Sequence, residues 1–265
     1  MTWMDTAATL RAQRVPAVLV TLASVRGHAP REAGAKMIVT AADDFGTIGG
    51  GNLEMTAVTR AREILTEVGA GSHAEPEMLT LRLNDKAPAK HGRQCCGGEV
   101  TVLLEPLPVA ASVAIFGIGN IGLELTRILA RHDLDLDVSD SRPEQLAEID
   151  RLEPPVANVR RHFAVIGEEV LTTLPAGAHV YIMTHDHAED LHLCDAALRR
   201  GDLGTIGLIG SSAKWQRFRK ALIAEGHDPE AVDTITCPIG LPELPGKHPA
   251  TIAVSVAADL LGRLA

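Results

Sequence analysis

The feature that most constrains the fold is a regular alternation of strand and helix patterns in the second half of the chain. From residue 112 onward, short apolar runs rich in Val, Ile and Leu are separated by segments with helical periodicity. This order predicts parallel βαβ units, because parallel neighbours in a sheet need a crossover connection that is usually a helix. The expected strands are Ser112–Gly117, Leu134–Asp140, Arg161–Val165, His179–Thr184 and Gly204–Ile209. The expected helices are Ile121–Arg131, Glu168–Leu174, Ala188–Arg199, Ala213–Glu225 and Ala250–Leu264, and the last is so apolar that we expect it to be buried between layers.

The first half of the chain has a different organisation. Neighbouring strand patterns there are joined without long crossovers, which favours an antiparallel or mixed sheet. The expected strands are Val15–Val25, Lys36–Thr40, Glu77–Leu83 and Glu99–Glu105, with helices over residues 3–14 and Asn52–Val68 and a turn over residues 41–46. A proline-containing segment, residues 105–110, separates the halves. The sequence thus predicts an α/β protein, with an N-terminal α/β domain over residues 1–108 and a C-terminal Rossmann-like parallel-sheet domain over residues 109–265.

Composition and charge narrow the function classes. Hydrophobic residues make up 46% of the chain but aromatic residues only 3%, which suits a parallel sheet covered by helices. The net charge of −9 argues against nucleic acid as a partner, since a phosphate backbone selects basic surfaces. The sequence has no apolar run near the ~20 residues that span a bilayer, no secretory signal pattern, and no zinc-type spacing of its four cysteines. We therefore expect a cytoplasmic protein that binds neither membrane nor nucleic acid.

The first strand of the second half leads into a glycine-rich turn. Gly117, Gly119 and Gly122 form a GxGxxG pattern between that strand and a helix. In dinucleotide-binding domains the first glycine permits a tight turn, the second lets a phosphate approach the backbone, and the third lets helix and strand pack closely. Asp140 ends the next strand, roughly 20 residues on, where a ribose-binding carboxylate is found. The pattern predicts a nucleotide-like or pyrophosphate-bearing ligand; the alternative is an empty Rossmann shell whose glycines serve only packing.

Two expectations follow for the neighbourhood of this turn. Arg142 would lie beside Asp140, either to hold a phosphate bidentately or to pair with that carboxylate. Gly117→Val should block the approach of a phosphate while leaving the fold mostly intact.

Polar groups also follow the later strands. His185 and Asp186 come after an apolar strand, at the edge where open α/β sheets bind ligands. We expect contact with an anion or cofactor there; a metal site or a helix cap is the alternative. After the next strand, a phosphate could bind the backbone near Gly210 and Ser211 with help from Lys214, or Ser211 could be an ordinary N-cap before a solvated basic face.

Two segments of the N-terminal half are unexplained by fold alone. One contains Cys95 and Cys96, adjacent cysteines that cannot readily form a low-strain disulfide. The preceding basic residues favour a thiolate, which suits sulfur chemistry and soft metals; inert loop thiols are the alternative. The other contains Gly49, Gly50 and Gly51 before a helix, which form either an anion nest or a flexible hinge.

Seven segments, in order along nearly the whole chain, carry a resemblance to a known family. They are APREAGAKM, GTIGGGNLE, RQCCGGEV, FGIGNIG with SDSR, THDHAED, GLIGSSAKWQRF and CPIGLPELPGKHPATIAVSVAADLL. Together they resemble the XdhC/CoxI family, the accessory proteins of bacterial molybdenum hydroxylases such as xanthine dehydrogenase. The resemblance implies a chaperone rather than an enzyme, which binds the molybdenum cofactor, shields it, assists replacement of an oxo ligand by sulfide and hands it to the apoenzyme. The implied partners are a molybdenum hydroxylase apoenzyme, a cysteine desulfurase and a second copy of the chain in a homodimer.

The resemblance also implies a cofactor site, with the molybdopterin form of the cofactor favoured. Cys95 is expected to contact molybdenum, with Cys96 a close second. The other implied binding residues are Arg31, Gly49, Gly50, Gly51, Glu54, Gln94, Gly97, Gly117, Gly119, Gly122, Asp140, Arg142, His185, Asp186, Gly210, Ser211 and Lys214. Asn120 stands where the family often has His, and His28 where it often has Ser or Thr; these departures leave the backbone cradle intact.

Two other function classes use the same features. An NAD(P)-dependent oxidoreductase would use the glycine-rich turn and Asp140, although no proton-transfer group with a supporting partner stands out beyond His185 and Asp186. A redox or nucleotide sensor would respond to oxidation of Cys95 and Cys96 while its Rossmann half binds NADP or a similar ligand.

Overall fold

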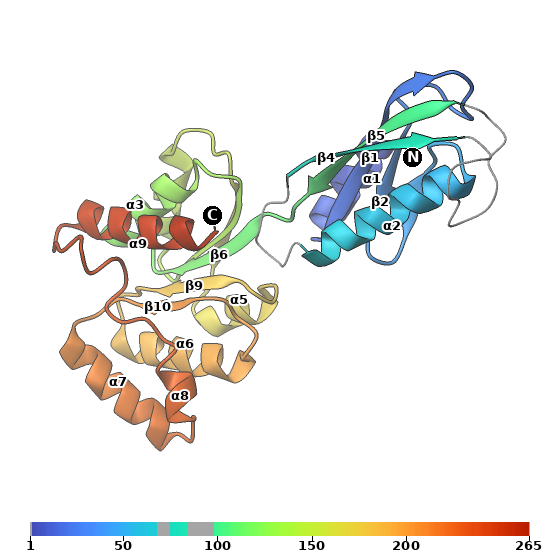
Figure 1. Cartoon of the computed structure of the whole chain (residues 1–265). Helices are drawn as coiled ribbons and strands as arrows, with labels where there is room; N and C mark the ends of the chain where they lie inside the picture. Colours follow the sequence, from blue (N-terminus) through green and yellow to red (C-terminus); the bar gives the residue numbers. More distant parts are fainter. Residues whose placement is uncertain (1, 68–74, 84–97, 265) are drawn as a thin grey trace. The chain divides into compact units, whose positions relative to one another are not determined.

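The computed structural model in Figure 1 describes residues 2–67, 75–83 and 98–264. The chain divides into two compact units, residues 1–109 and residues 110–265. The N-terminal unit is built on a five-stranded sheet in the order β3-β2-β1-β5-β4, in which every neighbouring pair is antiparallel. Its elements are α1 (Trp3–Ala12), β1 (Ala17–Arg26), β2 (Lys36–Val39), β3 (Asp44–Gly46), α2 (Gly51–Glu67), β4 (Glu77–Arg82) and β5 (Glu99–Leu107). Of the two sheet types expected for this half, the antiparallel one is confirmed.

The central strand of this unit, β1, is buried on both faces along its first six residues. On one face, Val18, Val20 and Leu22 belong to the same core cluster as the apolar stripe of α2. On the other face, Leu19 packs with Leu10 of α1. Because successive strand residues point to opposite faces, a strand covered on both sides must be apolar at nearly every position.

The C-terminal unit is built on a five-stranded parallel sheet in the order β10-β9-β6-β7-β8. Counted in chain order within this unit, that is 5-4-1-2-3, the strand order of a Rossmann fold. The predicted Rossmann-like parallel sheet is thereby confirmed. Its elements are β6 (Ala111–Phe116), α3 (Asn120–Leu129), β7 (Leu134–Asp140), α4 (Pro143–Ala147), the 3-10 helix η1 (Glu148–Arg151), β8 (Asn158–Phe163), α5 (Gly167–Thr173), β9 (His179–Ile182), α6 (His187–Arg200), β10 (Ile206–Leu208), α7 (Ser212–Ala224), α8 (Pro229–Val232) and α9 (Pro249–Leu264).

Helices cover both faces of the parallel sheet (Figure 1). On one face, α3 and α9 pack over Val113 and Ile115 of β6. On the other face, α5 and α6 pack over Ala114 and Phe116 of the same strand. β6 is therefore buried on both sides, and its carboxyl end is fixed at the centre of the unit.

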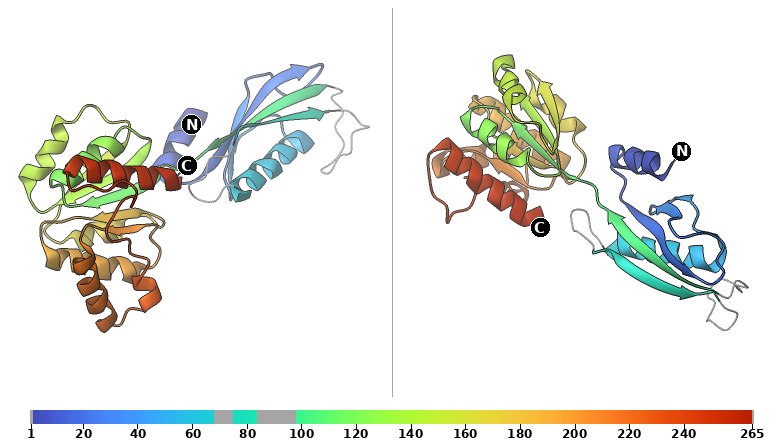
Figure 2. Two further views of the ribbon diagram at one scale, coloured as in Figure 1. Left: turned by 60° about the vertical axis from the view of Figure 1, so that its left-hand side comes forward. Right: turned by 90° about the horizontal axis from the view of Figure 1, so that it is seen from above.

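Three expectations drawn from the sequence were wrong. β8 begins and ends earlier than Arg161–Val165, because it is a polar edge strand and the apolar residues after it, such as Val165, are exposed. β3 lies in the segment expected to form only a turn. The last helix, α9, is not buried between layers: it packs on α3, Val254 is 49% exposed, and Figure 2 shows the helix along the surface of its unit. In the described parts of the chain, no helix is both long and apolar enough to cross a membrane.

Candidate functional site

The turns singled out in the sequence meet at the carboxyl edge of the parallel sheet. β6 leads into the glycine-rich turn, and its neighbour β9 leads into the segment that contains His185 and Asp186. The strand order reverses between β6 and β9, and open α/β sheets bind ligands in the crevice beside such a switch point. A crevice is present here, lined by Phe116, Gly117, Ser139, Asp140, Ser141, Thr184, His185 and Glu189.

The three glycines of the turn have different surroundings. Gly117 has a φ of 99°, and an added Cβ would collide with the carbonyl of Met183. A Cβ on Gly122 would collide with the carbonyl of Gly117, so this glycine lets α3 pack closely. Gly119 faces open space, with no atom of the described residues within 4 Å of an added Cβ. At Gly117 and Gly122 any side chain would collide with a backbone carbonyl, so both glycines are needed for the fold. The expectation that Gly117→Val would leave the fold mostly intact was therefore wrong.

The open glycine lies at the start of a helix. Gly119 is the N-cap of α3, and no side chain in the described part of the chain caps that helix end. The first N–H groups of a helix have no partner within the helix and attract anions. This helix end is therefore suited to a phosphate.

Asp140 is engaged within the fold. Its carboxylate accepts hydrogen bonds from the Ile118 N–H at 2.7 Å and from Nε and Nη2 of Arg142 at 2.9 Å each. The Asp140 side chain is only 2% exposed. Burial disfavours its charge, but the hydrogen bonds from Arg142 and from the backbone outweigh burial and hold the pKa of Asp140 below its ordinary value. Of the two roles considered for Arg142, the structure shows the pair with Asp140, and this carboxylate anchors the glycine-rich turn.

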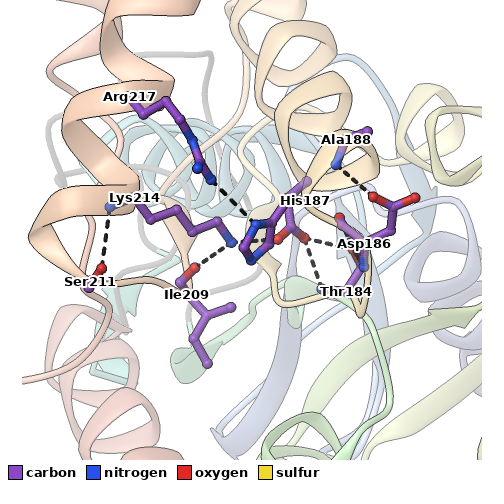
Figure 3. Close-up of polar contacts among 9 residues, drawn as sticks. Thr184, Asp186, His187, Ala188, Ile209, Ser211, Lys214 and Arg217 are labelled. Atoms are coloured by element: carbon purple, nitrogen blue, oxygen red, sulfur yellow. Dashed lines mark hydrogen bonds and ion pairs between the residues drawn. The ribbon is translucent and has the colours of Figure 1, made fainter.

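A buried ion pair joins the turns that follow β9 and β10 (Figure 3). Lys214 Nζ lies 2.5 Å from Asp190 Oδ2 and donates a hydrogen bond to the carbonyl of Ile209 at 2.9 Å. The other oxygen, Asp190 Oδ1, accepts the N–H and the hydroxyl of Thr184 at 2.9 and 2.8 Å. Gly210 makes room for the lysine, because an added Cβ would lie 2.8 Å from Lys214 Cδ. Lys214, expected at a phosphate, therefore fixes the two turns relative to each other.

Two other expected site residues cap helices. Asp186 is the N-cap of α6 and accepts the N–H of Ala188 at 2.7 Å, and Ser211 is the N-cap of α7 and accepts the N–H of Lys214 at 3.3 Å. The side chain of His185 is exposed beside the crevice. Among the residues that the structure describes, no three His, Cys, Asp or Glu side chains gather as for a metal. The segment after β9 thus starts a helix and presents His185 to the crevice.

Sequence reasoning missed two adjacent acids in the first turn of α6. Asp190 shares a helical stripe with the buried Leu193 and Ala197, and an acid in such a stripe was the available signal. Glu189 lines the crevice. Burial raises the pKa of Glu189 above its ordinary value; His185 opposes this shift and neighbouring acids, Asp190 first among them, add to it.

The three-glycine turn of the N-terminal unit binds a carboxylate of the same chain, that of Glu54. Glu54 Oε2 accepts the Ile48 N–H at 2.9 Å, the Gly50 N–H at 3.1 Å and the Thr47 hydroxyl at 2.5 Å. Residues 49 to 51 all have positive φ, at 129°, 74° and 62°. Burial opposes the charge of Glu54, but these hydrogen bonds hold its pKa below the ordinary value. The predicted nest therefore encloses the carboxylate of Glu54.

The remaining expected site residues belong to the same unit. Arg31 is exposed and lies beside the three-glycine turn, its Cγ 3.6 Å from a Cβ placed on Gly49. Gly98 is buried, and an added Cβ would collide with the carbonyl of His28. The residues that precede Gly98 and carry the thiol prediction lie outside the described residues: Gln94, Cys95, Cys96 and Gly97.

Fold and site together define a two-unit α/β protein whose C-terminal unit is a Rossmann domain with a glycine-rich turn at its switch point, and no described side chain caps the helix after this turn. The XdhC Rossmann domain matches residues 113–260, and the XdhC and CoxI family matches residues 10–74. The chain belongs to the XdhC/CoxI family, which confirms the resemblance carried by the seven sequence segments. Membership in this family supports an accessory, maturation-related role.

Two individual proteins are also similar to the chain. The uncharacterized protein YqeB of Escherichia coli K12 is 24% identical over 255 residues, which cover 96% of this chain and 45% of that protein. The chain thus spans less than half the length of this curated relative. A crystal structure described as a xanthine dehydrogenase from Bacillus halodurans is 20% identical, covers 100% of this chain and 96% of its own, and has a TM-score of 0.48.

Proposed function

We propose that the chain is a molybdenum-cofactor chaperone. It binds the cofactor, protects it while an oxo ligand is replaced by sulfide from a cysteine desulfurase, and delivers it to a molybdenum hydroxylase of the xanthine dehydrogenase type. The proposed working form is a homodimer. Family membership supports the accessory role. The observation that carries the cofactor assignment is the turn at Gly119 beside the switch-point crevice, where no described side chain caps the helix or blocks the approach of a ligand.

The terminal phosphate of the cofactor suits this turn. The N–H groups at the start of α3 and the positive end of its helix dipole attract an anion, and no Cβ blocks the approach at Gly119. At the far end of this edge, α7 is capped by Ser211, and the nearby ammonium of Lys214 is paired with Asp190. The proposed ligand is the molybdopterin form of the cofactor, whose single terminal phosphate would bind at the start of α3.

The molybdenum end of the cofactor is assigned to the thiols. Cys95 would contact the metal centre, with Cys96 the next choice, because thiolates are soft ligands suited to a sulfur-rich molybdenum site. The bound cofactor would supply the oxo or sulfido molybdenum centre that the client enzyme needs.

A nicotinamide nucleotide is the second candidate ligand, because the strand order and the GxGxxG turn are those of dinucleotide-binding domains. Asp140 weighs against it. That carboxylate would have to leave Arg142 and the Ile118 N–H to accept ribose hydroxyl groups. The oxidoreductase and the nucleotide sensor are therefore the weaker proposals.

A transfer assay tests the proposed function. The purified chain is loaded anaerobically with released molybdenum cofactor, treated with a cysteine desulfurase and cysteine, and mixed with an apo molybdenum hydroxylase. We expect the loaded chain to restore more hydroxylase activity than an equal amount of free cofactor treated in the same way. The double variant Cys95→Ala, Cys96→Ala should lose most of that advantage, while Cys237→Ala, at a partly buried thiol elsewhere, should keep it. Equal activity from the free cofactor and the loaded chain would refute the chaperone role.

A further inference from the structure

Two carboxylates line the switch-point crevice, and they differ in their partners. Both oxygens of Asp140 accept hydrogen bonds, from Arg142 and from the backbone of the glycine-rich turn. Glu189 receives no hydrogen bond and no ion pair from any residue that the structure describes. Glu189 is half-buried, so its carboxylate remains open to the crevice and can accept hydrogen bonds from a bound ligand.

The surroundings of Glu189 hold its carboxylate at the crevice wall. A Cβ built on Gly167, at the start of α5, would lie 3.4 Å from Glu189 Oε1 and 3.2 Å from the ring of Phe116. Gly167 and Phe116 are both buried, so the carboxylate stands beside an apolar surface. The helix that carries Glu189 is fixed at this point by the cap of Asp186 and by the ion pair of Asp190. The acid is therefore positioned in advance by its neighbours.

The charge around Glu189 excludes one class of ligand group. Asp140, Asp186 and Asp190 all act on Glu189 as like charges, whereas His185 and the guanidinium of Arg142 act in the opposite sense. A phosphate has acceptors and negative charge, so it is disfavoured at Glu189 and favoured at the start of α3. The crevice thus offers separate positions for an anion and for a group that donates hydrogen bonds.

We propose that Glu189 is the specificity-determining residue of this site and that its two oxygens accept the adjacent N–H donors on the amino-pyrimidinone edge of a pterin. This inference rests on the proposed function, because the molybdenum cofactor is the ligand that brings a pterin and a phosphate together. A carboxylate matches two parallel donors in the way it matches a guanidinium. A vicinal ribose diol offers a similar pair of donors, and the experiment below separates the two sources.

The test is equilibrium binding of released molybdenum cofactor to the wild-type chain, Glu189→Gln and Glu189→Ala. Glutamine keeps the shape but faces one ligand donor with its own N–H₂ group. We expect Glu189→Gln to raise the dissociation constant about tenfold or more. The control is Glu169→Gln, which removes the same charge from an exposed position on α5 and should leave affinity unchanged. Thermal melting of each variant should match the wild type, because Glu189 has no partner to lose in the free protein.

Competition experiments identify the donor group. In the wild type, 6-hydroxymethylpterin should displace the cofactor at lower concentration than AMP, which carries a ribose diol and a phosphate but no amino-pyrimidinone edge. That preference should disappear in Glu189→Gln. A wild-type chain that binds no cofactor would overturn the proposed function itself. Tight cofactor binding that is equal in Glu189→Gln, or a variant effect seen only with AMP, would overturn the assignment of Glu189 alone.

Discussion

Three carboxylates of this chain accept hydrogen bonds from a neighbouring turn: Asp140, Asp190 and Glu54. The turns at Asp140 and Glu54 contain glycines, the turn at Asp190 does not, and all three were expected from the sequence to contact an external anion or cofactor. In the folded chain the carboxylate orders the turn, since a buried backbone N–H must find an acceptor. Glu189 differs from all three because no described residue donates to it.

The Asp190–Lys214 pair should be important for stability. Asp190 is fully buried, so Lys214→Met leaves its charge without a cation, and we expect a loss of about 3–5 kcal/mol in the free energy of unfolding. Adding Asp190→Asn to that variant should recover part of the loss. Lys220→Met, on the exposed side of α7, is the control and should change stability little. Urea unfolding measures all four proteins; a loss below about 1 kcal/mol in Lys214→Met would contradict the buried pair.

Glu54 should give the N-terminal unit a pH-dependent stability. Its pKa is lowered in the folded chain from an ordinary value of 4.5. Its contribution is therefore complete above pH 4.5 and is lost as the pH falls through the lower, folded-state pKa. In Glu54→Gln we expect stability to fall by about 1–3 kcal/mol at neutral pH and that part of the acid dependence to vanish. Glu32→Gln, at an exposed position, should keep the wild-type profile in chemical unfolding from pH 3 to 7; matching profiles for Glu54→Gln and wild type would count against the nest.

At the scale of elements, the strand–helix alternation predicted the parallel sheet because period and apolar content reflect burial directly. The same pattern placed β8 too late in the chain. This edge strand consists largely of Arg, His and Asn, while the exposed connection after it is apolar. The pattern could not show that Asp140, Lys214 and the three-glycine turn would be satisfied internally. The contacts Ile118–Asp140 and Lys214–Asp190 join residues 22 and 24 positions apart, so only the three-dimensional arrangement brings them together. The contacts of Arg142 with Asp140 and of the three-glycine turn with Glu54 are local, but the residue pattern alone does not decide between an internal and an external partner.

The glycine-rich turn provides a matched pair of variants at this scale. Gly119→Ala places a methyl group in open space, so it should cost at most about 1 kcal/mol as a poorer N-cap while weakening cofactor binding. Gly122→Ala drives a Cβ into the carbonyl of Gly117 and should cost more than about 2 kcal/mol in the free energy of unfolding. Thermal melting measures the loss of stability in each variant, and cofactor titration measures the loss of affinity. Full cofactor affinity in Gly119→Ala would show that the phosphate does not bind at this turn.

At the scale of the whole molecule, the family relationship extends over both units, but the chain spans less than half of the curated relative. The two units carry different chemistry in this account. The N-terminal unit carries the thiols assigned to molybdenum, and the C-terminal unit carries the groups assigned to phosphate and pterin. Variants in either unit should therefore lower cofactor affinity without unfolding the other.

The most direct test of the central claim is anaerobic equilibrium binding of freshly released molybdenum cofactor to the purified chain, with NAD and NADP titrated in parallel. We predict a dissociation constant in the micromolar range or tighter for the cofactor, weakened in Cys95→Ala, Cys96→Ala, and much weaker binding of either nucleotide. Tight binding of NAD or NADP with none of the cofactor would contradict the chaperone account and would favour an oxidoreductase or a nucleotide sensor.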